Sequence, residues 1–148
     1  MPLKDRLFED LKSAMRQRNE LRRSVIRLVR AAIQVEEIAK RKPLDDDGVV
    51  DILSRLVRQH HESISEFQRG NRPDLVEREE AELAIVRQYM PQQLTVAELT
   101  DLARRTIGEV SAEGASDMGR VMGKLMPMVR GRADGTTVSQ IVVELLSG

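Results

Sequence analysis

The chain of 148 residues contains no cysteine and no tryptophan, and its only aromatic residues are Phe8, Phe67 and Tyr89. The lack of cysteine excludes disulfides, thiolate metal sites and a cysteine nucleophile. The scarcity of aromatic rings argues against modules that bind single-stranded nucleic acid by stacking successive bases on side chains. Any contact with nucleic acid would therefore depend on charge and shape.

Several motifs of catalysis and targeting are also missing. The patterns G-x-x-x-x-G-K, G-x-G-x-x-G, G-x-S-x-G and H-E-x-x-H do not occur, which leaves no phosphate loop, dinucleotide fingerprint, nucleophile elbow or zinc helix. No run approaches the ~18 uncharged residues that a membrane span requires, and the N-terminal residues mix charged with apolar side chains. We therefore expect a cytoplasmic protein without a membrane partner, metal or other cofactor, and with no catalysis of its own.

The formal net charge is zero, but it is unevenly distributed along the chain. Residues 1–42 hold 12 basic and 6 acidic groups, residues 43–94 hold 6 and 11, and residues 95–148 hold 6 and 7. The segments therefore carry net charges of +6, −5 and −1. Because neutrality is a cancellation between segments, it does not exclude an anionic partner.

Apolar residues recur with helical spacing throughout, and no run alternates with a period of two. We therefore predict an all-α protein, with long antiparallel helices over residues 1–93 and a small three-helix domain over residues 94–148. The polar residues 17–20 are the expected break in the first helical stretch. The predicted buried face beyond that break comprises Leu21, Val25, Leu28, Ala32, Val35 and Ile38.

Helix starts are predicted from capping residues. One of Asp45, Asp46 and Asp47 is expected to cap the helix that follows Pro43. Residues 95–98 have the capping-box spacing, in which a Thr hydroxyl and a Glu carboxylate each satisfy a free backbone N–H. Ser116 and Thr137 are the predicted caps of the last two helices.

Histidine and acidic residues offer little sign of a site. His60 and His61 are the only histidines, and as helix neighbours they point about 100° apart, which disfavours joint chelation of one ion. We interpret both as ordinary surface residues. The acidic run Glu77, Glu79, Glu80 and Glu82 is interpreted as a solvated helix face, with pairing to the basic N-terminal segment as an alternative.

Basic residues in the first third form a possible phosphate-binding stripe. Arg23, Arg27 and Arg30 share one side of a helix, and Lys12 and Arg16 join them only if that helix is continuous. Such a stripe is able to follow a phosphate backbone, although a solvated helix face must also be charged somewhere. We treat Arg23, Arg27 and Arg30 as a secondary candidate site.

The most unusual stretch is 117–135. Gly119 and Gly123 lie four residues apart in a predicted helix, where each costs ~1 kcal/mol relative to Ala unless a neighbouring backbone approaches closely. That neighbour is either a helix of the same domain or a nucleic-acid backbone. Arg120 and Lys124 repeat the spacing one position later. A glycine loop follows, and its candidate residues are Arg130, Gly131, Arg132 and Gly135.

This stretch resembles the C-terminal motif of the GatB/YqeY family. The similarity is carried by 117–123, Met126, Val129, Gly131, 133–135 and Val138. Residues 25–29, 66–67, 72–76 and 89–94 are similar to the helical domain of YqeY-like proteins, so that the resemblance covers nearly the whole chain.

The resemblance implies a helical tail domain shared with GatB, a component of the glutamine-dependent amidotransferase that converts misacylated Asp-tRNA or Glu-tRNA to the amide form. In that enzyme the tail contacts tRNA, and catalysis belongs to a larger domain that has no counterpart in these residues.

Our leading hypothesis is a non-catalytic tRNA-binding or amidotransferase-associated protein. The expected phosphate contacts are Arg120, Lys124, Arg130 and Arg132, and the glycines expected to permit close approach are Gly119, Gly123, Gly131 and Gly135. The alternative is a protein-interaction module that docks on a partner or on itself through its long charged helices. A stand-alone amide-forming ligase is the third hypothesis, and no nucleotide-binding motif supports it. The sequence leaves the oligomeric state and the identity of the RNA open.

Overall fold

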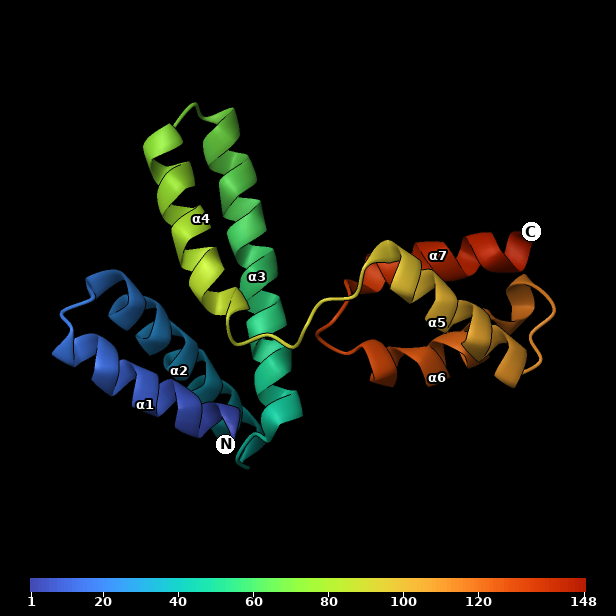
Figure 1. Ribbon diagram of the computed structural model, residues 1–148, viewed down its shortest axis with the longest axis horizontal. Helices are drawn as coiled ribbons and strands as arrows, with labels where there is room; N and C mark the ends of the chain where they lie inside the picture. Colours follow the sequence, from blue (N-terminus) through green and yellow to red (C-terminus); the bar gives the residue numbers. More distant parts are fainter. The chain divides into compact units, whose positions relative to one another are not determined.

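The computed structural model describes residues 1–148, and it confirms the all-α prediction (Figure 1). Its chain order is α1 (Leu3–Arg16), α2 (Glu20–Lys40), α3 (Asp46–Arg69), α4 (Pro73–Arg87), α5 (Val96–Glu109), a 3₁₀ turn η1 (Ala115–Asp117), α6 (Met118–Val129) and α7 (Gly135–Ser147). The chain forms two compact units, unit 1 (Met1–Met90) and unit 2 (Pro91–Gly148). The division into domains over residues 1–93 and 94–148 stays a prediction.

Unit 1 consists of two helical hairpins. Figure 1 shows α1 beside α2 and α3 beside α4, and α2 also packs on both helices of the second hairpin. The turn between α1 and α2 falls at the predicted break, where Asn19 accepts a hydrogen bond from the Arg22 N–H. Fully buried apolar side chains from all four helices fill the core, and each contributes roughly 1.5–3 kcal/mol by leaving water. They are Leu7, Ile26, Val29, Val49, Leu53 and Val86.

The buried face of α2 differs from the prediction. Val25, Ile26, Val29 and Ile33 face the core. In contrast, three of the expected core residues are exposed, namely Leu28 at 53%, Val35 at 66% and Ile38 at 69%. The prediction is confirmed for Val25 and wrong for these three residues, because α2 has two apolar faces and helical spacing alone does not say which one is covered.

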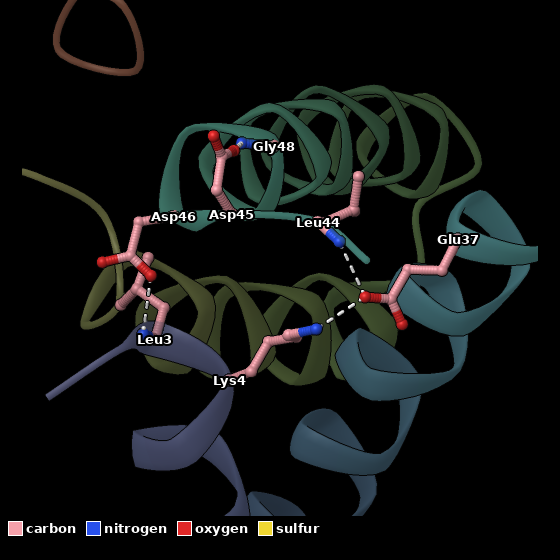
Figure 2. Close-up of polar contacts among 7 residues, drawn as sticks. All are labelled: Leu3, Lys4, Glu37, Leu44, Asp45, Asp46 and Gly48. Carbon is pink, nitrogen blue, oxygen red and sulfur yellow. Dashed lines mark hydrogen bonds and ion pairs between the residues drawn. The ribbon is translucent and has the colours of Figure 1, made fainter. Parts of the chain in front are cut away.

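A polar junction joins α1, α2 and the start of α3 (Figure 2). Glu37 Oε2 lies 2.6 Å from Lys4 Nζ and accepts a 2.8 Å hydrogen bond from the Leu44 N–H. The Leu3 N–H donates to Asp46 Oδ1 at 2.9 Å. The hydrogen bonds from Lys4 and Leu44 hold the pKa of the Glu37 carboxyl below its usual value of 4.5.

Two predicted helix caps are confirmed. Asp45 Oδ1 accepts from the Gly48 N–H at 2.9 Å at the start of α3. At the start of α5, Thr95 Oγ1 accepts from the Glu98 N–H, and Glu98 Oε1 accepts from the Thr95 N–H. Both caps could be predicted from the sequence because each capping side chain and its backbone partner are three residues apart.

Unit 2 is a three-helix arrangement in which α5, α6 and α7 each contact the other two. Its fully buried core residues are Leu99, Ala103, Val121, Leu125, Val129, Val138 and Val142. Two predicted starts were wrong: Ser116 lies inside η1, and Thr137 lies inside α7, which begins at Gly135. The helix α6 also continues through Pro127 to Val129.

Candidate functional site

The exposed side of α6 carries Gly119 and Gly123. Both residues lie on the face opposite the buried Val121 and Leu125. A Cβ added at either glycine would meet no atom within 4 Å. The structure therefore excludes the interpretation in which these glycines admit a neighbouring helix of their own unit, and it leaves open space beside a bare stretch of helix.

Arg120 and Lys124 border this glycine face, and both make contacts within unit 2. Arg120 donates to the carbonyl of Val110 and to Asp117 Oδ1, each at 3.0 Å. Lys124 Nζ lies 2.7 Å from Glu109 Oε2. These contacts link α6 to the C-terminal end of α5.

The same contacts lower two carboxyl pKa values. The pKa of Glu109 lies below its usual value because Lys124 hydrogen-bonds the carboxylate. The pKa of Asp117 is lowered first by the Glu113 backbone N–H and then by Arg120. Both cations remain exposed at the surface, where ion pairs exchange readily with solvent and salt.

The turn between α6 and α7 holds the remaining predicted residues. Gly131 has φ 71°, a left-handed conformation that favours glycine. Arg132 Nε donates to the carbonyl of Gln92 at 3.0 Å, and the carbonyl of Gly131 accepts from Gln93 Nε2 at 2.7 Å. The turn is thus fixed against the segment that precedes α5, and Arg130 is exposed within it.

Gly135 is the first residue of α7, and an added Cβ would meet Met126 Cε at 3.8 Å, which is ordinary contact. Its position therefore shows no steric requirement for glycine. A role of these eight residues in binding RNA stays a prediction.

The secondary stripe lies on α2 in unit 1. The break after α1 separates Lys12 and Arg16 from it, and Arg23 pairs with Glu20 on its own helix. Arg27 and Arg30 line a pocket of about 480 Å³ together with Lys4, Gln34 and Glu37. The Arg30 guanidinium also lies over the Phe8 ring at 5.1 Å, a cation–π contact.

The structure contradicts the surface interpretation of His60. Its exposure is only 7%, and Nδ1 lies 2.6 Å from Glu79 Oε2 and 3.9 Å from Glu82 Oε2. Glu79 and Glu82 are therefore not a freely solvated face. His61 is exposed as expected, and its Nε2 lies 2.9 Å from Arg87. Helical spacing could have distinguished the two histidines, because His60 lies four residues from both Leu56 and Ile64 on the buried face of α3.

Comparison with known proteins identifies the family. A family model described as "Yqey-like protein" matches residues 4–146. The chain therefore belongs to the YqeY-like protein family.

Three fungal relatives are named "Altered inheritance of mitochondria protein 41, mitochondrial". The relative from Lachancea thermotolerans is 44% identical over 87 residues, which cover 58% of this chain and 46% of that protein. The one from Pyrenophora tritici-repentis is 33% identical over 145 residues, with 95% and 79% covered. The one from Saccharomyces cerevisiae is 34% identical over 128 residues, with 80% and 69% covered. This chain thus spans less than half of the first relative.

The names of these relatives overturn the expectation of a cytoplasmic location. All three are mitochondrial proteins by name. The expectation was wrong because it depended on the lack of a continuous apolar segment, whereas mitochondrial targeting segments are amphipathic. No helix in the structure has the length and apolar character needed to cross a membrane.

Proposed function

We propose that this chain is a non-catalytic accessory protein that binds the phosphate backbone of folded tRNA through unit 2 and works with a glutamine-dependent aminoacyl-tRNA amidotransferase. The observation that carries the proposal is the open space beside Gly119 and Gly123. Glycine inside a helix costs about 1 kcal/mol relative to Ala, a cost that applies to Gly123 within α6, and no atom of unit 2 uses the space beside either glycine. A ligand backbone packed against the bare helix would use it.

The charge around this face suits a phosphate ligand. Arg120 and Lys124 lie one helical turn apart, and their carboxylate partners are Asp117, whose side chain is 25% exposed, and Glu109, whose side chain is 54% exposed. Exposed ion pairs contribute only about 0–1 kcal/mol, so exchanging a carboxylate for a phosphate costs little. Arg130 and Arg132 add guanidinium groups, which bind phosphate with two parallel hydrogen bonds.

The link to an amidotransferase comes from the family resemblance. The motif in residues 117–138 resembles the tail of GatB, the part of that enzyme that contacts tRNA. The chain has no phosphate loop or nucleotide-binding motif, so we assign it binding and not amide formation. The scarcity of aromatic residues favours a folded RNA, recognised by backbone and shape, over an extended single strand.

Fluorescence anisotropy with labelled tRNA, measured over a range of salt concentrations, tests the proposal. Lys124→Gln and Arg130→Gln should each weaken binding and reduce the slope of log affinity against log salt by about 0.7–0.9. Arg104→Gln is the matched control, because this exposed residue lies five positions before Glu109 and therefore about 140° around α5. Unchanged affinity and slope in both test variants, with helical content retained, would contradict the site.

A second candidate function rests on the uncovered apolar face of α2. Leu28, Val35 and Ile38 are more than half exposed, and with Ala31 they follow the spacing i, i+3, i+7, i+10 of a helix-pairing seam. The seam lies in the basic segment 1–42, and the acidic segment 43–94 offers a surface of opposite charge. These features favour docking of the seam on the acidic segment of a second copy of the chain.

Sedimentation at several protein concentrations separates this candidate from the first. Self-association predicts a dimer at low salt that dissociates at high salt and in Val35→Ser/Ile38→Ser. Val96→Ser, equally exposed in unit 2, is the control and should not change the dimer. A salt-insensitive monomer at every concentration would exclude the second candidate.

A further inference from the structure

Three metal-ligating side chains converge between α3 and α4. His60 is buried in the middle of α3, and Glu79 and Glu82 lie one turn apart on α4 with side-chain exposures of 21% and 17%. Both carboxylates turn an Oε2 atom toward Nδ1 of His60, at 2.6 Å and 3.9 Å. One ligand atom from each residue lies within 4.8 Å of the other two.

These distances approach those around one bound ion, and the widest separation, within 4.8 Å, would close slightly on binding. Metal bonds to imidazole nitrogen and carboxylate oxygen are about 2.0–2.2 Å long, so ligand atoms around one ion lie roughly 3–4 Å apart. The His60–Glu79 contact is slightly shorter than this and would open as an ion enters between the two side chains. The other contact, to Glu82, already falls in the required range.

The packing of α3 against α4 holds the three side chains in positions suited to binding a metal ion. Two helices packed against each other hold the ligands, as in bundles whose metal sites use inward-facing Glu and His residues. Arg78 is the one cation with a contact to this cluster, and it reaches Glu82 through the other carboxylate oxygen, Oε1, at 3.4 Å. Oε2 therefore remains directed at His60.

The ligand set selects the kind of ion. One imidazole nitrogen with two carboxylate oxygens suits a divalent first-row transition metal such as zinc, whereas magnesium and calcium prefer oxygen ligands alone. Three protein ligands also leave at least one coordination position for water. We infer that His60, Glu79 and Glu82 form a binding site for a zinc-class divalent ion between α3 and α4. This inference is independent of RNA binding, which is assigned to unit 2.

Calorimetry with ZnCl₂ on the full chain, free of a polyhistidine tag and treated with chelator beforehand, tests the inference. We expect one zinc ion per chain, no comparable binding of MgCl₂, and at least a ten-fold loss of zinc affinity in Glu82→Gln and His60→Gln. His61→Gln is the matched control, since the adjacent histidine is exposed and contacts Arg87, and it should bind zinc as the parent does.

The absorption spectrum of bound Co²⁺ is a second measurement. A purely structural His–Glu hydrogen bond, without metal coordination, would give no such absorption. The parent chain and His61→Gln should show visible d–d bands, and Glu82→Gln should lose them. If His60→Gln does not fold, Glu82→Gln decides the question, because Glu82 lies beyond hydrogen-bond distance of His60. Absence of stoichiometric zinc binding to the parent, or full retention of binding in Glu82→Gln, would overturn the inference.

Discussion

Lys124 Nζ on α6 lies 2.7 Å from Glu109 Oε2 at the end of α5, so the cation that borders the glycine face is paired with a carboxylate of its own unit. A phosphate that binds Lys124 must displace this carboxylate. The pair is exposed, and such pairs contribute about 0–1 kcal/mol. Glu109 therefore competes with phosphate for Lys124 in the proposed site.

Removing the competing carboxylate should strengthen tRNA binding. We expect Glu109→Gln to raise affinity by about two- to five-fold, which corresponds to the free energy of an exposed ion pair. Anisotropy titrations at one fixed salt concentration measure the change. Glu113→Gln removes the same charge from an exposed position in the same unit and is the control. Equal effects of the two substitutions would mean that only net charge matters.

The two faces of α2 offer a matched pair of valines. Val29 is 1% exposed and Val35 is 66% exposed. Val29→Ala should lower the free energy of unfolding by about 2 kcal/mol, because it removes buried methyl groups and leaves a cavity. Val35→Ala should change it by no more than about 0.5 kcal/mol. Urea unfolding of both variants measures the difference, and similar losses would contradict the observed packing of α2.

Acid should destabilise the junction in Figure 2. Hydrogen bonds from Lys4 and Leu44 lower the pKa of Glu37 in the folded state below its ordinary value of 4.5. A lowered folded-state pKa stabilises the protein above the ordinary value, and this stabilisation is lost as the pH falls through the folded-state pKa. Thermal unfolding from pH 7 to pH 3 should therefore show a smaller loss of stability in Glu37→Gln than in the parent. An identical pH dependence would contradict this role of Glu37.

Local signals in the sequence predicted much of the fold. The all-α class follows from helical spacing, and the caps at Asp45 and Thr95 involve partners only three residues away. Ser116 and Thr137 have the same chemistry but are not caps, because Ser116 lies inside η1, with α6 beginning only at Met118, and α7 begins at Gly135, before Thr137. A capping residue thus indicates that a helix starts nearby, but it does not identify the first residue of that helix.

Features set by distant contacts were not predictable in the same way. The choice between the two apolar faces of α2 depends on where α1, α3 and α4 pack. The contact between His60 and Glu79, nineteen positions away, likewise depends on how α3 pairs with α4. In contrast, the unusual glycines of α6 were recognised from their cost in a helix, and only the structure showed that nothing in unit 2 lies beside them.

In the proposed RNA complex, Gly119 and Gly123 are glycine because a ligand backbone approaches them. The most direct test measures both unfolding free energy and tRNA affinity for Gly119→Ala/Gly123→Ala. The open space accepts both methyl groups, so the variant should be more stable by roughly 0.5–1 kcal/mol, most of it from Gly123 inside α6. If a ligand backbone contacts these glycines, the more stable protein should bind tRNA at least several-fold more weakly. Increased stability with unchanged tRNA affinity would contradict that contact.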